Sequence, residues 1–156
     1  MSVPSALRAA AKKGGVLSDP TSGTLARFTH EGMLSYFHNR WNQTSFLERN
    51  PPLSNCNGAF SAWSFYDLNG GVSNAASTLS MWKACALDGS CICPPGSSKA
   101  NHRQDQSALT LALASQGVRC EGKWVAAHGI KRHVEPGEVF QRHAPQCRTL
   151  YTSRKE

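Results

Sequence analysis

The sequence lacks the motifs and the long apolar runs that would place it in a functional class at once. It has neither a P-loop nor a G-x-G-x-x-G sequence, so no phosphate-cradling loop is recognisable. No apolar stretch approaches the length of a membrane span. Residues 1–15 place their basic side chains after a short apolar part, which is the reverse of the order in a signal peptide. We therefore expect a chain with no membrane span and no secretion signal.

Recognised metal-binding spacings are also missing. There is no D-x-D pair, no H-E-x-x-H and no paired C-x-x-C set, which argues against a structural zinc site. Four histidines, at positions 102, 128, 133 and 143, remain as isolated candidates. His128 differs from the others because it ends the apolar run "WVAAH", where the rim of a site lies in an open α/β sheet. His133 and His143 are better explained as surface histidines.

The charge of the chain is basic but scattered. It has 17 Lys and Arg against 10 Asp and Glu, a net charge of +7, with a mild excess at both ends. A nucleic-acid-binding protein more often gathers its cations on one stripe interleaved with aromatic residues. A basic surface also attracts phosphorylated small molecules, and a solvated basic surface needs no ligand at all. No nucleic-acid partner is predicted.

The cysteines and the N-terminus point to different compartments. Six cysteines, at positions 56, 85, 91, 93, 120 and 147, permit three disulfides of unknown connectivity, although Cys91 and Cys93 are too close to pair with each other. Asn42 begins an N-x-T glycosylation acceptor. In a cytosol the thiols would stay reduced. We expect the secretory pathway or Golgi if the chain is part of a longer enzyme, and otherwise the cytoplasm.

Hydrophobic periodicity and turn residues predict a loop-rich α/β or α+β fold with short strands and three to four helices. The segment 16–28 is rich in turn residues, and residues 49–58 and 88–103 read as loops. One helix is expected to begin at Thr29 and to bury Met33, Tyr36 and Phe37, and another to turn Leu79, Trp82 and Leu87 inward. The expected helices are 4–13 (capped by Ser5), 29–41, 73–87 and 105–116, and the expected strands are 59–68 and two within 118–128.

The stretch "NHRQDQSALTLALASQG" (101–117) contains the most informative acid. Asp105 precedes an apolar run that ends at Gly117, so it can act as the cap of a buried helix. Capping does not explain why its neighbours His102, Arg103 and Gln106 are all strong hydrogen-bonding groups. The alternative is that Asp105 faces a substrate.

Three segments, taken in order, resemble a known family. They are "THEGMLSYF" (29–37), "MWKACALDGSCICPPGSS" (81–98) and "HRQDQSALTLAL" (102–113), followed by a cysteine at 120 and a histidine at 128. Together they resemble the C-terminal half of GT-A-like nucleotide-diphospho-sugar transferases. The resemblance covers roughly residues 25–135. It divides the chain into an N-terminal segment 1–24, a glycosyltransferase-like region 25–135 and a basic tail 136–156.

The resemblance implies roles for particular residues. Asp105 and Gln106 would be the catalytic pair that orients the donor sugar or the acceptor hydroxyl, and His102 and Arg103 would bind substrate beside them. His128 would be the metal ligand, holding Mn²⁺ or Mg²⁺ against the diphosphate.

Two cations would act on the same leaving group. Lys131 and Arg132 would bind substrate by neutralising the departing diphosphate.

Enzymes of this family also have a Rossmann-like donor half that ends in a D-x-D metal site. We expect that half to lie before residue 1, so the chain would be a fragment that is inactive alone. Its partners would be a nucleotide-sugar donor and an unknown acceptor. A different class of function fits the cysteines equally well, namely a non-catalytic, cysteine-rich secreted or surface binding module. A basic nucleic-acid-binding domain fits least.

Overall fold

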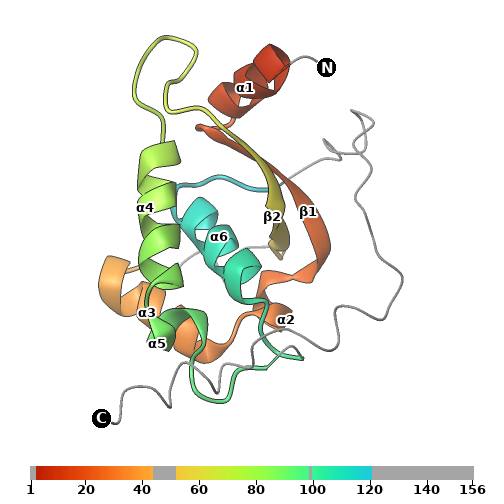
Figure 1. The fold of residues 1–156 in the computed structure, drawn as a ribbon, viewed down its shortest axis with the longest axis vertical. Coiled ribbons are helices and arrows are strands. Elements are labelled where there is room, and N and C mark those ends of the chain that lie inside the picture. The colour runs from red at the N-terminus through yellow and green to blue at the C-terminus, as the bar shows by residue number, and fades with distance from the viewer. Residues whose placement is uncertain (1–2, 44–51, 99, 121–156) are drawn as a thin grey trace.

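The computed structural model describes residues 3–43, 52–98 and 100–120. Within them the chain combines a two-stranded antiparallel sheet with four longer helices and two single-turn helices, which confirms the predicted mixed α and β class (Figure 1). In chain order the elements are α1 Val3–Lys12, β1 Val16–Thr24, α2 Leu25–Phe28, α3 Glu31–Trp41, β2 Ser54–Trp63, α4 Ala75–Ala86, α5 Gly89–Ile92 and α6 Gln104–Ser115.

The sheet joins two segments that are far apart in sequence. Val16 of β1 lies opposite Trp63 of β2, and the register shifts on both sides of Pro20, which faces Cys56. A proline has no N–H to offer a neighbouring strand, so an irregular register there is expected. The prediction that 16–28 is turn-rich is wrong for β1, because pairing with β2 outweighs its turn-forming composition.

Helix α6 forms the centre of the molecule, between α4 and β2 (Figure 1). Every residue from 107 to 114 is buried, so this helix has no solvent-facing side over two turns. A helix that is apolar all round must be enclosed by other elements. The predicted helix and its stop are confirmed, since Gly117 follows with a φ of 73°.

Helix α4 turns a different face to the core from the one predicted. Leu79 is 40% exposed and Leu87 is 76% exposed, whereas Ala75, Met81 and Cys85 are buried. Small side chains allow the backbones of two helices to approach closely, which explains why the face containing Ala75 lies against α6. The prediction of the buried face failed because it relied on the large side chains of Leu79 and Leu87, which are exposed.

The other helix ends differ slightly from expectation. Helix α3 begins at Glu31, capped by the ring of His30 rather than by Thr29, and it buries Met33 and Phe37. Ser5 lies inside α1 instead of capping it, while Gly14 and Gly15 follow that helix with positive φ. No helix among the described residues is long and apolar enough to cross a membrane.

Disulfides cross-link the core. Cys56 of β2 is bonded to Cys120, and Cys85 of α4 is bonded to Cys91 of α5. Cys93 is also disulfide-bonded. The prediction that Cys91 and Cys93 do not pair with each other is confirmed. The loop predicted at 88–103 contains the single turn α5, which places Cys91 opposite Cys85.

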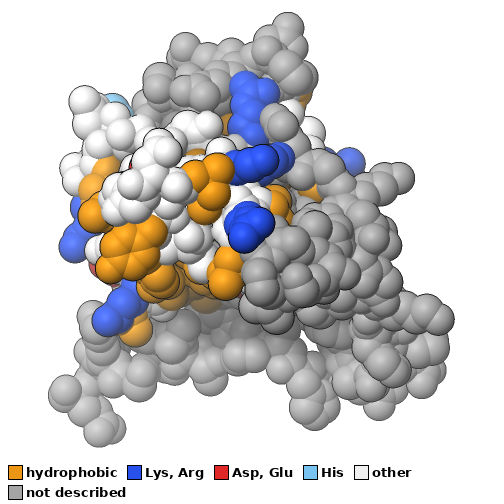
Figure 2. All heavy atoms as spheres, turned by 90° about the horizontal axis from the view of Figure 1, so that it is seen from above, with side chains coloured by type: hydrophobic (Ala, Val, Ile, Leu, Met, Phe, Trp, Pro, Cys, Tyr) orange, Lys and Arg blue, Asp and Glu red, His pale blue; other side chains and the backbone are white. Residues whose placement is uncertain are grey.

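A different set of apolar side chains stays outside the core. The turn between β2 and α4 exposes four of them, and α1 exposes one more; Figure 2 looks onto this end of the molecule. They are Phe65, Tyr66, Leu68, Val72 and Leu7.

Candidate functional site

The first turn of α6 meets the middle of β2 at a glycine. A Cβ atom placed on Gly58 would lie 3.0 Å from Oδ2 of Asp105 and 3.9 Å from Cγ of Gln106. A glycine inside a strand often marks a point where another group approaches the backbone closely. The Asp-Gln pair of α6 and the Asn57–Gly58 segment of β2 therefore form one surface.

Asp105 is the exposed member of this surface. It is the second residue of α6, whose N-cap position is held by Arg103. Among the described residues, no backbone N–H donates to the Asp105 carboxylate, so the helix-capping interpretation of Asp105 is wrong. A negative charge in the first turn still suits the helix dipole. The carboxylate remains available to a ligand.

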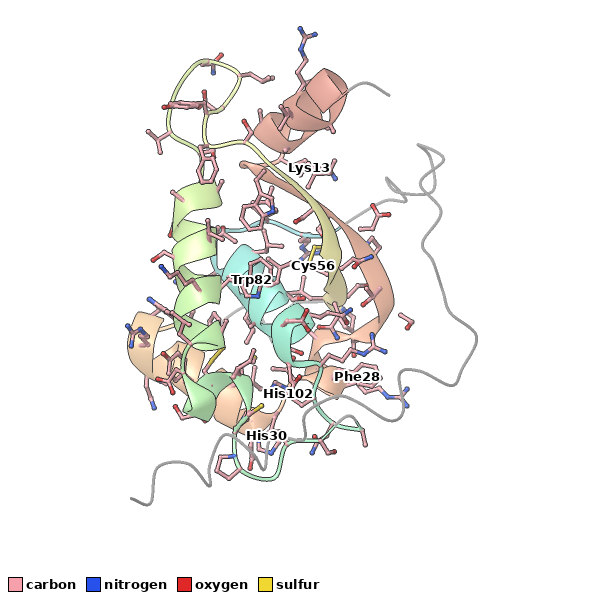
Figure 3. The ribbon with its side chains drawn as sticks, viewed as in Figure 1. Lys13, Phe28, His30, Cys56, Trp82 and His102 are labelled. Carbon is pink, nitrogen blue, oxygen red and sulfur yellow. A yellow bond between two sulfur atoms is a disulfide. The ribbon has the colours of Figure 1, made fainter. Side chains whose placement is uncertain are left out.

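Two stacked tryptophans adjoin the first turn of α6. Nε1 of Trp82 donates to the backbone carbonyl of Asp105 at 3.2 Å. The indole of Trp82, labelled in Figure 3, stacks on that of Trp63, with ring centroids 6.1 Å apart and planes 3° apart. Trp63 in turn donates from Nε1 to Oγ of Ser61 at 2.6 Å. Both indoles are half-buried, so rigid aromatic surface adjoins an acid.

Gln106 is held in place by Thr110, one turn further along α6. Its side chain is half-buried, and its backbone carbonyl accepts a hydrogen bond from Oγ1 of Thr110 at 2.6 Å. The same Thr110 oxygen accepts from the backbone N–H of Cys56 at 2.8 Å. The position of the Asp-Gln pair over β2 is thus set by a hydroxyl one turn further along α6.

His102 precedes α6 by two residues and is 4% exposed. Its Nδ1 accepts from the backbone N–H of His30 at 3.3 Å, so its Nε2 carries the proton that faces the carbonyl of Ile92 at 3.1 Å. Burial lowers the pKa of His102, the hydrogen bond to Ile92 opposes that shift, and the nearby His30 adds to it. The rings of His30 and His102 meet edge to face, 6.3 Å apart (Figure 3).

Arg103 ties the start of α6 to the end of β1. Its guanidinium donates to the carbonyl of Ser22 and to Oγ1 of Thr21, and lies 4.0 Å from the centroid of the Phe28 ring. Its backbone N–H donates to the carbonyl of Phe28 at 2.9 Å. These contacts hold the guanidinium half-buried against the protein.

Several predicted residues cannot be placed. His128, Lys131 and Arg132 lie outside the described residues, as do residues 121–128 of the segment 118–128 in which two strands were expected. In the part of the chain that is described, no three His, Cys, Asp or Glu side chains are grouped so that they could hold a metal ion. A shallow hollow on α3 is lined by Leu34 and His38 among others, and none of its lining residues belongs to α6 or β2.

The resemblance implied roles for Asp105 and Gln106 but not for the residues that lie next to them in the fold. Gly58, Trp63 and Trp82 come from β2 and α4, and only the fold brings them to α6. The prediction of a loop over 49–58 is wrong for its last five residues, because β2 begins at Ser54. Had "CNGAF" been recognised as part of a strand, its glycine would have suggested a close backbone approach.

This chain matches no protein-family model, no curated protein and no solved structure in the three comparisons made.

Proposed function

We propose that the surface around Asp105 is a sugar-binding site, the acceptor side of a nucleotide-sugar glycosyltransferase. One observation carries the proposal: the exposed Asp105 carboxylate sits directly over Gly58 with Gln106 beside it. The sequence resemblance rests on the segment that contains Asp105 and Gln106. Their close approach to a strand glycine gives that resemblance a physical surface, which combines an exposed carboxylate with a carboxamide.

The chemistry of the surface suits a carbohydrate. A carboxylate accepts hydrogen bonds from hydroxyls, and bonds to a charged acceptor are stronger than neutral ones. The carboxamide of Gln106 both donates and accepts. The indoles of Trp63 and Trp82 offer flat apolar area, as the C–H face of a sugar ring requires. Asp105 would orient the reacting hydroxyl, and Gln106 would fix the ring beside it.

His102 and Arg103 would serve this site by supporting it. Both ring nitrogens of His102 are engaged, and the guanidinium of Arg103 is held by Thr21, Ser22 and Phe28. In this proposal they fix the start of α6, so that the Asp105 carboxylate keeps one position over β2. Positioning of this kind contributes to catalysis because reacting groups must be aligned closely.

The residues that would bind the nucleotide-sugar donor are assigned by the sequence resemblance alone. A bound Mn²⁺ or Mg²⁺ would stabilise the leaving diphosphate. His128, Lys131 and Arg132 are the residues expected there, and we assign no reaction step through the ion.

The test is sugar binding measured by saturation-transfer NMR, with a panel of monosaccharides and nucleotide sugars. Asp105→Asn should weaken binding of the recognised sugar by roughly tenfold or more, because a hydrogen bond to a charged acceptor is lost. Glu31→Gln is the matched control, since Glu31 is also an exposed acid in the first turn of a helix. Equal binding by both variants would remove Asp105 from the site.

A second candidate is a non-catalytic secreted or surface binding module, favoured by the disulfides Cys56–Cys120 and Cys85–Cys91. Disulfide-rich modules of this kind form in oxidising compartments. Alkylation of the protein from its natural source, followed by mass spectrometry, would count its free thiols. Intact disulfides together with no response to any sugar in the panel would favour this candidate over the transferase.

A further inference from the structure

We propose that one end of the molecule binds the surface of an anionic lipid bilayer, without spanning it. This membrane-binding end consists of the turn 64–73 between β2 and α4, together with the exposed side of α1. It lies at the end of α4 away from α5, and it shares no residue with the Asp105 surface (Figure 1).

The turn carries apolar side chains that the fold leaves in solvent. Val72 is 80% exposed, Tyr66 65%, Leu68 54% and Phe65 45%, and Leu7 on the neighbouring α1 is 42% exposed. Apolar side chains scattered singly over a surface need no explanation, but several on one protruding turn mark an interaction site. Figure 2 shows hydrophobic side chains gathered at one side of this end of the molecule.

Internal hydrogen bonds hold the turn rigid. Oδ1 of Asp67 accepts from the backbone N–H groups of Asn69 and Gly71, each at 2.8 Å, and the N–H of Asp67 donates to the carbonyl of Gly71. Tyr66 and Val72 form an isolated antiparallel bridge across the turn. The apolar side chains are therefore presented on an ordered backbone, so that little further ordering is needed on binding.

The same contacts use the acid of the turn internally. Asp67 is half-buried, and a Cβ placed on Gly71 would lie 2.7 Å from its Oδ2. Its carboxylate therefore faces its own backbone rather than outward. The Asp67 carboxylate, the acid of this turn, already accepts hydrogen bonds from the N–H groups of Asn69 and Gly71.

Helix α1 supplies cations next to the turn. Arg8, Lys12 and Lys13 are exposed on or just after it. The glycine turn that ends α1 lies against the base of 64–73, because Ser64 donates its N–H to the carbonyl of Gly15 at 2.8 Å. Figure 2 shows Lys and Arg side chains beside the hydrophobic ones.

This combination favours a bilayer over a protein partner. Apolar side chains on a narrow protruding turn can enter the boundary between headgroups and acyl chains, while flanking cations meet anionic headgroups.

The experiment is flotation of the full chain with vesicles of phosphatidylcholine alone and with vesicles that also contain phosphatidylserine. We expect binding only to the second kind, weakened by added salt because exposed charges are screened. Leu68→Ser should lower the partition coefficient by roughly tenfold, since it removes apolar area that enters the bilayer. Leu87→Ser is the matched control, because Leu87 is a leucine at the other end of α4 that is even more exposed than Leu68.

Several results would overturn the proposal. One is the absence of binding to either kind of vesicle, and another is an equal loss in Leu68→Ser and Leu87→Ser. A third is binding that depends on Lys12 and Lys13 but is unaffected by Leu68→Ser, which would show attraction without insertion of the turn. If sedimentation instead shows self-association that Leu68→Ser abolishes, the end binds a second copy of the chain. Leu68 is exposed, so its replacement should leave folding intact.

Discussion

Neighbouring residues at the start of α6 have opposite environments. Asp105 is exposed beside Gly58, whereas Ser107, two residues later, is fully buried and donates its hydroxyl to the carbonyl of Phe28 at 2.7 Å. His102 and Arg103 use their polar atoms on the protein itself. One short polar stretch therefore contains a solvent-facing acid and three residues that anchor it. Residue type alone does not separate these tasks, because each of the four side chains hydrogen-bonds equally well.

His102 gives a pH dependence at this scale. Burial lowers its pKa below the ordinary histidine value, which applies in the unfolded chain. The unfolded state then binds the proton more readily, so the stability from neutral His102 is fully present above about pH 6.5 and is lost as the pH falls through the folded pKa. We expect the midpoint temperature of thermal unfolding to fall between about pH 7.5 and about pH 5. The fall should be larger in the wild type than in His102→Gln.

The other histidines are the same in both proteins, so the difference between the two losses isolates the contribution of His102. The His102→Gln variant lacks the titrating ring. It should be less stable than the wild type at neutral pH, but its stability should change less with pH. Parallel profiles would show that protonation of His102 does not oppose folding.

At the scale of elements, Thr110 joins α6 to β2. Its Oγ1 accepts from the buried N–H of Cys56 and donates to the carbonyl of Gln106. Thr110→Val should destabilise the protein by about 1–3 kcal/mol, because the Cys56 N–H is left buried without an acceptor. Amide hydrogen exchange at Cys56 is the direct measurement and should become faster.

Thr110→Ser is the control for this prediction, since it keeps the hydroxyl and removes only a methyl group. Its Cys56 amide should exchange at nearly the wild-type rate. Unchanged protection of Cys56 in the valine variant would mean that β2 is held to α6 by packing alone.

The elements show which parts of the fold sequence patterns can predict. Helices α1, α3, α4 and α6 have caps, stops or apolar periodicity and were predicted within a few residues. Strand β1 was missed because "SDPTSG" has turn composition, and its partner β2 lies about 40 residues away. The single turns α2 and α5 are too short for a periodic signal. Tertiary pairing, rather than local preference, decides such segments.

The candidate site follows the same division. Asp105 and Gln106 were predictable because they are adjacent at a helix start. Gly58, Trp63 and Trp82 were not, because their proximity depends on the docking of α6 against β2 and α4. The inward face of α4 was missed for a related reason. Close packing against α6 favours Ala75 and Cys85 over the larger Leu79.

At the scale of the whole molecule, the disulfides Cys56–Cys120 and Cys85–Cys91 restrain very different lengths of chain. Cys85–Cys91 spans 6 residues between neighbouring helices, while Cys56–Cys120 spans 64 residues that include α4, α5 and α6. In the chain-entropy account, a cross-link stabilises a protein by restricting its unfolded state, and more so for a longer loop. The loop closed by Cys56–Cys120 therefore contains α6, the central helix of the fold.

The two cross-links should differ measurably in their effect on stability. For the two loop lengths, the chain-entropy term predicts that Cys56→Ala/Cys120→Ala loses about 2 kcal/mol more unfolding free energy than Cys85→Ala/Cys91→Ala. Urea unfolding under oxidising conditions measures both losses. Under reducing conditions the unfolded chains have no cross-links, so the gap between the two variants should close. Equal losses in oxidising buffer would show that core packing of Cys85 and Cys91, both fully buried, outweighs the entropy of the longer loop.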